Sequence, residues 1–157
     1  AKPVANVPTI AVTVAKKQAR FKRVREPKGP DSGIGEFFLL VDVTAIGGPA
    51  YIPLSIASGK KPTGFVYQIE GTAAGTISTA NVSSSGTGVT QVTLGTVLYA
   101  KIPTGKTGTF RILIEIRGKA GNEYGVIVSR INYKNDPDEA RYRKFEEEIR
   151  GKTIRFA

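Results

Sequence analysis

Three stretches of the sequence carry residue types that could take part in catalysis or ligand binding. The first, Gly105–Thr107 (GKT), ends like a phosphate-binding P-loop, but Ala100 occupies the place of that motif's first glycine. No helix signal follows, so the tripeptide predicts a turn between strands. The second, Glu146–Glu148, groups three carboxylates among basic neighbours and lacks the apolar surroundings that raise the pKa of a catalytic acid. It predicts a solvated surface.

The third stretch, Asn135–Glu139 (NDPDE), offers oxygen ligands of the kind that calcium prefers. The candidate ligands are Asp136, Asp138 and Glu139. The stretch lacks the spacing of an EF-hand and contains a proline, so turn formation and helix capping are the competing interpretation. Elsewhere, the absence of Cys and His excludes the common zinc, haem and iron–sulfur sites and removes the usual general base near neutral pH. The sequence therefore predicts no cofactor and no enzyme activity.

A basic run near the N-terminus is the main charge feature of the chain. The net charge is +10, and residues 1–30 hold eight Lys or Arg and a single acidic residue. The run suits an edge strand that is protected against aggregation, contact with an acidic cell-surface polymer, or contact with nucleic acid. Phe21 is the one aromatic residue in the run, so nucleic acid is the least supported partner. The predicted basic surface consists of Lys16, Lys17, Arg20, Lys22, Arg23, Arg25 and Lys28.

The segment just before this run predicts a short strand, because apolar and polar residues alternate in it. Such a strand either pairs within its own domain or adds to the sheet of a neighbouring copy. Strand addition that repeats head to tail is a heterologous contact and produces an open filament. The candidate inter-subunit strand consists of Thr9, Ile10, Ala11, Val12, Thr13 and Val14.

The rest of the chain predicts short strands that are joined by turns. Gly35–Ala45, Phe110–Arg117 and Tyr124–Tyr133 alternate most clearly, and the last two predict a hairpin across Gly118–Asn122. Gly71–Gly88, rich in Gly, Ser, Thr and Ala, predicts a loop or a weak edge strand. These patterns predict an all-β fold, a two-sheet antiparallel sandwich of immunoglobulin-like or jelly-roll type.

The C-terminal region departs from this pattern. Asp136 suits a helix N-cap, Pro137 the first turn and Gly151 the residue after a helix end, so one short helix is expected between them. The expected domain division is a basic N-terminal arm with a strand over residues 1–30 and a sandwich over residues 31–157. No apolar run reaches the roughly 20 residues of a membrane-spanning helix. A chain that starts at Ala1 without a methionine fits a mature extracellular protein after signal-peptide removal.

Four segments occur in an order that resembles a known kind of domain: Phe37–Pro53 (FFLLVDVTAIGGPAYIP), Gly64–Gly71 (GFVYQIEG), Val97–Ile116 (VLYAKIPTGKTGTFRILIEI) and Gly125–Tyr133 (GVIVSRINY). They resemble the immunoglobulin-like, all-β extracellular domains of predicted surface proteins in candidate-phylum bacteria. That resemblance implies secretion, a surface role and no reaction. The layout of a strand before a sandwich is also similar to camelysin and TasA-type matrix fibres and to donor-strand pili.

Three functions are therefore expected, in decreasing order of support. The first is an extracellular structural subunit that associates with itself into a filament or a cell-surface layer by strand addition. The second is an adhesion or carbohydrate-binding module, with Tyr51, Tyr67, Tyr99 and Tyr124 as the aromatic residues of a sugar platform, although alternation favours their burial in the core. The third is a viral coat protein with a basic arm over nucleic acid.

Overall fold

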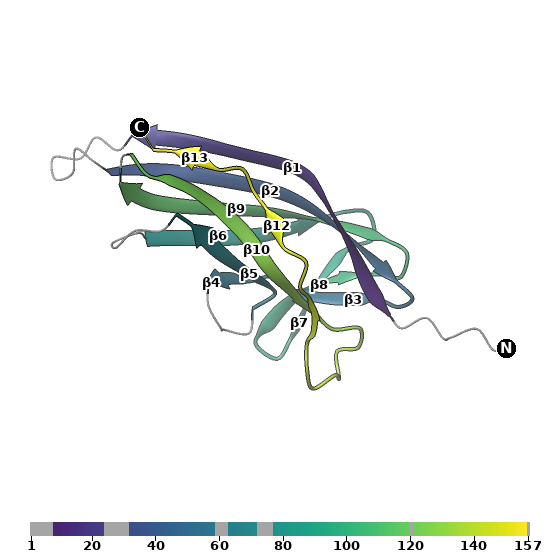
Figure 1. The fold of residues 1–157 in the computed structure, drawn as a ribbon. Helices are drawn as coiled ribbons and strands as arrows, with labels where there is room; N and C mark the ends of the chain where they lie inside the picture. Colours follow the sequence, from purple (N-terminus) through teal and green to yellow (C-terminus); the bar gives the residue numbers. More distant parts are fainter. Residues whose placement is uncertain (1–7, 24–31, 59–62, 72–76, 120, 157) are drawn as a thin grey trace.

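The computed structural model describes residues 8–23, 32–58, 63–71, 77–119 and 121–156. Within these ranges the chain forms β-strands and no helix, so the expectation of an all-β fold is confirmed. The strands lie in two elongated layers with a smaller sheet at one end (Figure 1). The alternation of apolar and polar residues is the cause, because a period of two suits only a strand with one buried face.

The first layer, sheet A, has the strand order β1-β2-β9-β6 and is antiparallel throughout. Its central strand β2 (Ser32–Ile46) buries Phe37, Leu39, Val41 and Val43 on the inner face, while the residues between them are half-buried on the outer face. The other strands of sheet A are β1 (Thr9–Arg23), β9 (Thr107–Lys119) and β6 (Ile77–Ser85).

The second layer, sheet C, is built around β10 (Glu123–Tyr133), which pairs with β5 (Phe65–Glu70). On its far side β5 pairs in parallel with β4 (Ile56–Ser58). The other side of β10 receives three short strands from the C-terminal segment: β11 (Arg143–Phe145), β12 (Ile149–Arg150) and β13 (Ile154–Arg155).

A third sheet, sheet B, has the order β3-β8-β7 and lies at one end of the two layers (Figure 1). Its strands are β3 (Ala50–Pro53), β8 (Val97–Ile102) and β7 (Thr90–Leu94). Residues from all three sheets join in one hydrophobic cluster. Phe65 of β5 and Phe110 of β9 link the two main layers, with ring centroids 5.2 Å apart. The layers thus form a sandwich whose core lies between them.

A cluster of three aromatic rings closes the end of the sandwich opposite sheet B. Phe156, which is fully buried, lies 4.5 Å from Tyr124 and 5.0 Å from Phe21 between ring centroids. Two glycines make room for these rings: a Cβ at Gly35 would come within 2.8 Å of Phe156, and one at Gly118 within 2.5 Å of Tyr124. Phe156 also accepts a backbone hydrogen bond from Gly121 and donates one to Asn122, both through its main chain. The C-terminus is therefore anchored beneath β1.

The expected helix between Asp136 and Gly151 is wrong. Glu139 and Arg143 form an ion pair of 3.3 Å, but the backbone between them bends irregularly rather than forming a helix, and β11 begins at Arg143. The reason is tertiary: β10 exposes a row of backbone groups beside the core, and the segment satisfies them as β11 and β12. Gly151 donates to the carbonyl of Val126 and packs against its side chain. The described residues contain no helix of the length and apolarity needed to cross a membrane.

One other expectation about local structure, the hairpin, is also wrong. The segments Phe110–Arg117 and Tyr124–Tyr133 are strands, but they do not pair with each other: β9 pairs with β2 and β6, and β10 with β5 and the C-terminal strands. The connection between them crosses from one layer to the other. Within Gly71–Gly88, for which a loop or a weak edge strand was expected, residues 77–85 form the edge strand β6.

Candidate functional site

The predicted inter-subunit strand lies at one edge of sheet A. Thr9–Val14 is the first part of β1, which continues to Arg23 and pairs antiparallel with β2 in the same chain, from Thr9 opposite Ile46 to Arg23 opposite Gly33. A bulge between Val14 and Lys16 divides β1 into two halves. Among the described residues, β2 is the one strand that β1 pairs with. The opposite side of β1 is therefore hydrogen-bonded to no described strand, although β13 and Phe156 lie close to its far end.

The six residues of this segment divide between the two faces of the sheet. Ile10 points into the core and is 5% exposed, and Val12 packs half-buried against the same cluster. Val14, further along the same face, is 37% exposed. The alternate residues Ala11 and Thr13 are exposed on the outer face, and Thr9, also exposed, has its hydroxyl 3.5 Å from that of Tyr133 in sheet C. The first part of β1 is thus held by Ile10 in the core, whereas Val14 exposes its apolar side chain to solvent.

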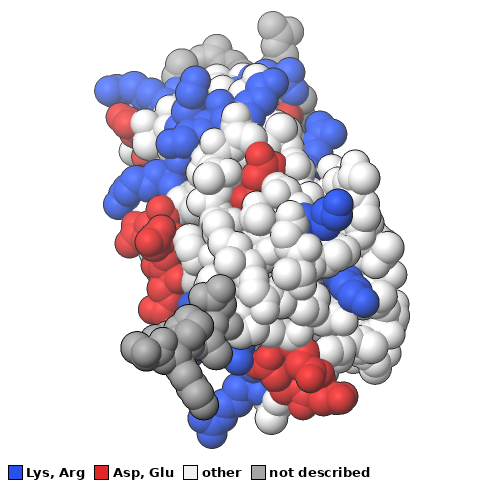
Figure 2. Space-filling model, turned by 90° about the vertical axis from the view of Figure 1, so that its right-hand side faces the viewer, with Lys and Arg blue, Asp and Glu red and all other residues white. Residues whose placement is uncertain are grey.

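The predicted basic surface is only partly described. Lys16, Lys17 and Arg20 are exposed on β1, and Arg20 forms an ion pair of 3.0 Å with Glu36 on β2. The side chains of Lys22 and Arg23, and the whole of Arg25 and Lys28, lie outside the described residues. Figure 2 views the molecule from the right-hand side of Figure 1. Lys and Arg gather towards the top of this view, and Asp and Glu lie at its left side and at its lower end.

Two cations from distant parts of the sequence join the described basic residues. Arg111 of β9 lies over the ring of Phe38 at 5.0 Å, and Lys152 follows β12 in the C-terminal segment. Together with Arg20 and Glu36 they line a shallow hollow of about 570 Å³ on the β1 side of sheet A. Their contribution was not foreseen, because Arg111 and Lys152 lie about 90 and 130 residues after Arg20 in the sequence.

A second groove runs between β1 and the C-terminal segment. It has a volume of about 330 Å³ and is bounded by Val12 and Val14 on one side and Phe145 and Ile149 on the other. Both signs of charge lie at its rim, with Lys17 on β1 and Glu147, Glu148 and Arg150 across from it. On this side of the sandwich, partly buried side chains join sheets A and C, and no described strand of one sheet is hydrogen-bonded to a strand of the other.

The opposite edge of sheet A, β6, is the part of the site that the sequence analysis missed. Its sequence, ISTANVSSS, contains no charged residue, no proline and no glycine, and it pairs with β9 without a register shift. Thr79, Asn81 and Ser83 are exposed on its outer face, while Ala80 and Val82 pack half-buried against the core. Within the described ranges, β9 is its single strand partner. A weak alternation of Ala80 and Val82 with polar residues was the available signal.

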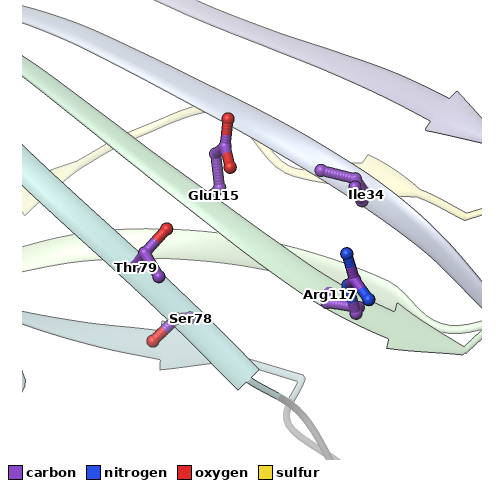
Figure 3. Close-up of a pocket in the computed structure, with 5 residues that line it drawn as sticks. All are labelled: Ile34, Ser78, Thr79, Glu115 and Arg117. Atoms are coloured by element: carbon purple, nitrogen blue, oxygen red, sulfur yellow. The ribbon is translucent and has the colours of Figure 1, made fainter.

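A hollow of about 280 Å³ lies where β6 begins, beside the end of β9. Figure 3 shows the residues around it, with Glu115 and Arg117 on β9 and Ile34 on β2. Thr79 and Ser78 on β6 point to opposite sides of the strand (Figure 3), and the Ser78 hydroxyl lies 2.9 Å from the hydroxyl of Tyr67 in the other layer. The hollow combines one carboxylate with one guanidinium and is shallow, so it lacks the grouped acids or nucleophile of a catalytic site.

The calcium candidate forms a tight turn. Asp136 accepts a hydrogen bond from the backbone of Asp138 at 2.9 Å, and the Glu139 carboxylate accepts from the backbones of Asn135 and Asp136 and from Arg143. Over the part of the chain that the structure describes, no three Asp or Glu side chains converge where a metal ion could be held. The carboxylates thus act in turn formation here, and the calcium site stays a prediction.

The four tyrosines of the sugar-platform hypothesis are all buried. Tyr51, Tyr67, Tyr99 and Tyr124 are between 1% and 8% exposed, so they belong to the core, as the alternation favoured. Tyr99 instead holds the C-terminal segment, because its hydroxyl lies 3.0 Å from that of Tyr142. Burial, followed by this hydrogen bond, raises the pKa of Tyr142 from 10.0 to about 12.

Comparisons with protein-family models, with curated proteins and with solved structures give no match for this chain. The case for a function therefore depends on the edges and surfaces of the sandwich.

Proposed function

We propose that this chain is an extracellular structural subunit of immunoglobulin-like type that associates with itself by β-strand addition. The observation that carries the proposal is the position of β1: it lies at an edge of sheet A, and its outer side is hydrogen-bonded to no described strand. Main-chain groups at an open edge supply hydrogen bonds to an added strand, and alternate side chains supply specificity. Val14, at 37% exposure, offers an apolar side chain for such a contact.

A charge-blocked edge tests this proposal. Val14→Lys replaces the exposed apolar side chain of β1 with a cation, which an added strand would have to bury at a cost in free energy. Electron microscopy and sedimentation velocity should show filaments or layers for the original chain and monomers for the variant. Leu94→Lys on β7 is the matched control, since Leu94 is 38% exposed and belongs to sheet B. Monomers of the original chain at all concentrations would refute the proposal.

A second candidate function is adhesion to an acidic surface polymer. It is favoured by the hollow in which Arg20, Arg111 and Lys152 surround Phe38, with Glu36 as the single acid that lines it. Binding of a polyphosphate probe that weakens steeply with salt, and that is lost in Arg111→Ala with Lys152→Ala, would support it. A single-stranded oligonucleotide in the same assay tests the coat-protein alternative. No binding by either probe at low salt would exclude both.

A further inference from the structure

We infer that the acceptor of strand addition is β6 of a second copy of this chain, so that β1 of one copy extends sheet A of the next. This inference rests on the proposed function and specifies its interface. The two edge strands of sheet A differ in their protection against pairing with other strands. β1 carries a bulge and the exposed cations Lys16, Lys17 and Arg20. Both features hinder an edge strand from pairing with the same strand of another copy. β6 carries none of them.

The strand directions make the pairing geometrically direct. β1 is antiparallel to β2, β2 to β9, and β9 to β6, so β6 runs opposite to β1. A second copy in the same orientation, moved sideways along the sheet, therefore presents its β1 antiparallel to β6. The pattern of sheet A continues without interruption across the contact. Because the contact joins two different surfaces, it repeats and gives a filament rather than a closed dimer.

The side chains on the two edges suit each other on both faces. On the inner face, exposed Val14 and half-buried Val12 of β1 would meet Ala80 and Val82 of β6, and burial of these side chains favours pairing. On the outer face, Thr13 would lie among the hydroxyl and amide groups of β6, a combination that forms cross-strand hydrogen bonds.

Charge selects this partner over the two symmetric alternatives. Pairing of β1 with another β1 would bring Lys16, Lys17 and Arg20 of both copies together, and like charges on facing strands are destabilising. Pairing of β6 with another β6 has no such penalty, but it leaves both β1 edges open and stops at a dimer. The neutral edge of β6 accepts the cationic edge of β1 without repulsion, and this contact is the one that extends.

Charge substitution on β6 separates these alternatives. Asn81→Lys with Ser83→Lys adds cations to the accepting edge, where position 81 lies opposite Thr13 and diagonal to Lys16 of the incoming β1, and it should raise the protein concentration at which assemblies form by roughly tenfold or more. Asn81→Glu with Ser83→Glu adds the same amount of charge with the opposite sign, and it should preserve or promote assembly because a carboxylate at position 81 lies diagonal to Lys16 of β1. Both pairs are exposed, so thermal unfolding should be unchanged within a few degrees.

The outcomes distinguish this inference from the proposed function. If the original chain assembles and the β6 lysine variant assembles equally well, the acceptor is not β6, while assembly through β1 stands. If the lysine and glutamate variants are equally impaired, β6 pairs with β6 and the inference is overturned. If the original chain never assembles, both fail.

Cross-linking identifies the contact directly, because the sequence has no cysteine. Isotopically heavy Ala11→Cys protein is mixed with light Ser83→Cys protein, assembled and treated with a short bismaleimide. Heavy–light products should dominate in mass spectrometry. Light–light products alone would indicate pairing of β6 with β6, and heavy–heavy products alone would indicate pairing of β1 with β1; either result contradicts the inference.

Discussion

The two edge strands of sheet A differ in how they are attached to the body of the protein. β1 is paired with β2 along its length and is anchored at its end by Phe21, which packs on Phe156 beneath it. β6 pairs with β9 over nine residues and is tied to the other layer by the hydrogen bond between Ser78 and Tyr67. Its inward side chains are small and half-buried. The long, charged strand is thus firmly held, and the short, neutral one weakly.

In a sheet that assembles by strand addition, one edge must present an ordered strand and the other must stay accessible to it. A strand that is presented to a neighbour must stay ordered before the neighbour arrives, since ordering it during binding reduces the affinity. β1 meets this requirement through the aromatic cluster at its end. An acceptor edge needs access more than rigidity, and the uncharged β6 provides it. The following substitutions test how each edge is held, from the largest expected effect to the smallest.

Phe156→Ala should have the largest effect, because it removes the ring on which both Phe21 and Tyr124 pack. Truncation of a fully buried phenylalanine typically costs about 3–5 kcal/mol in the free energy of unfolding. Hydrogen exchange should become faster in β1 and β13, with little change in β6. Urea unfolding measures the total loss, and Phe156→Leu, which keeps most of the volume, is the control. Equal acceleration in both edges would contradict the proposed anchor.

Gly35→Ala perturbs the same aromatic cluster by adding volume to it rather than removing volume. The added methyl group would lie 2.8 Å from the rings of both Phe156 and Phe37, closer than carbon atoms approach without displacement. Overpacking of this kind typically destabilises by about 1–3 kcal/mol. Urea unfolding should show that loss, and combining the change with Phe156→Leu should recover part of it by making room. Full additivity of the two changes would argue against a direct clash.

Ser78→Ala tests the attachment of β6 and should have a smaller effect. It deletes the 2.9 Å hydrogen bond to the buried Tyr67 hydroxyl, and such a loss costs about 1 kcal/mol. Amide exchange should become faster in β6 while β1 stays protected. Ser83→Ala on the exposed outer face is the matched control and should change stability little. Unchanged exchange in the Ser78 variant would mean that pairing with β9 alone holds the strand.

The sequence predicted those parts of the fold in which the local pattern and the final environment agree. β2 was foreseen because Phe37, Leu39, Val41 and Val43 alternate with residues that the structure leaves on the outer face. The position of β1 was foreseen in part, since its first six residues alternate clearly. The bulge after Val14 changes the phase, and this explains why the strand was expected to end there.

The parts that were not foreseen depend on which strands become neighbours. The segments on either side of Gly118 look like a hairpin, yet they belong to different layers, and the ring of Tyr124 packs over Gly118 across the space between them. Asp136–Gly151 has helix signals at both ends, but the open side of β10 gives its backbone a better set of partners. The sequence left β6 open between a loop and a weak edge strand, because the strand depends on pairing with β9 more than on its own residues.

The smallest effect concerns the C-terminal segment that carries Phe156, which Tyr142 fastens to β8 through Tyr99. Because the pKa of Tyr142 is raised to about 12 in the folded protein, the unfolded chain loses this proton first as the pH rises above 10. The contribution of this group to stability is therefore complete below pH 10 and declines between pH 10 and about 12. Unfolding midpoints should fall less steeply over this range in Tyr142→Phe, which cannot ionise. Identical slopes would show that the tyrosine pair does not hold the segment, and the anchoring of β1 would then depend on the aromatic cluster alone.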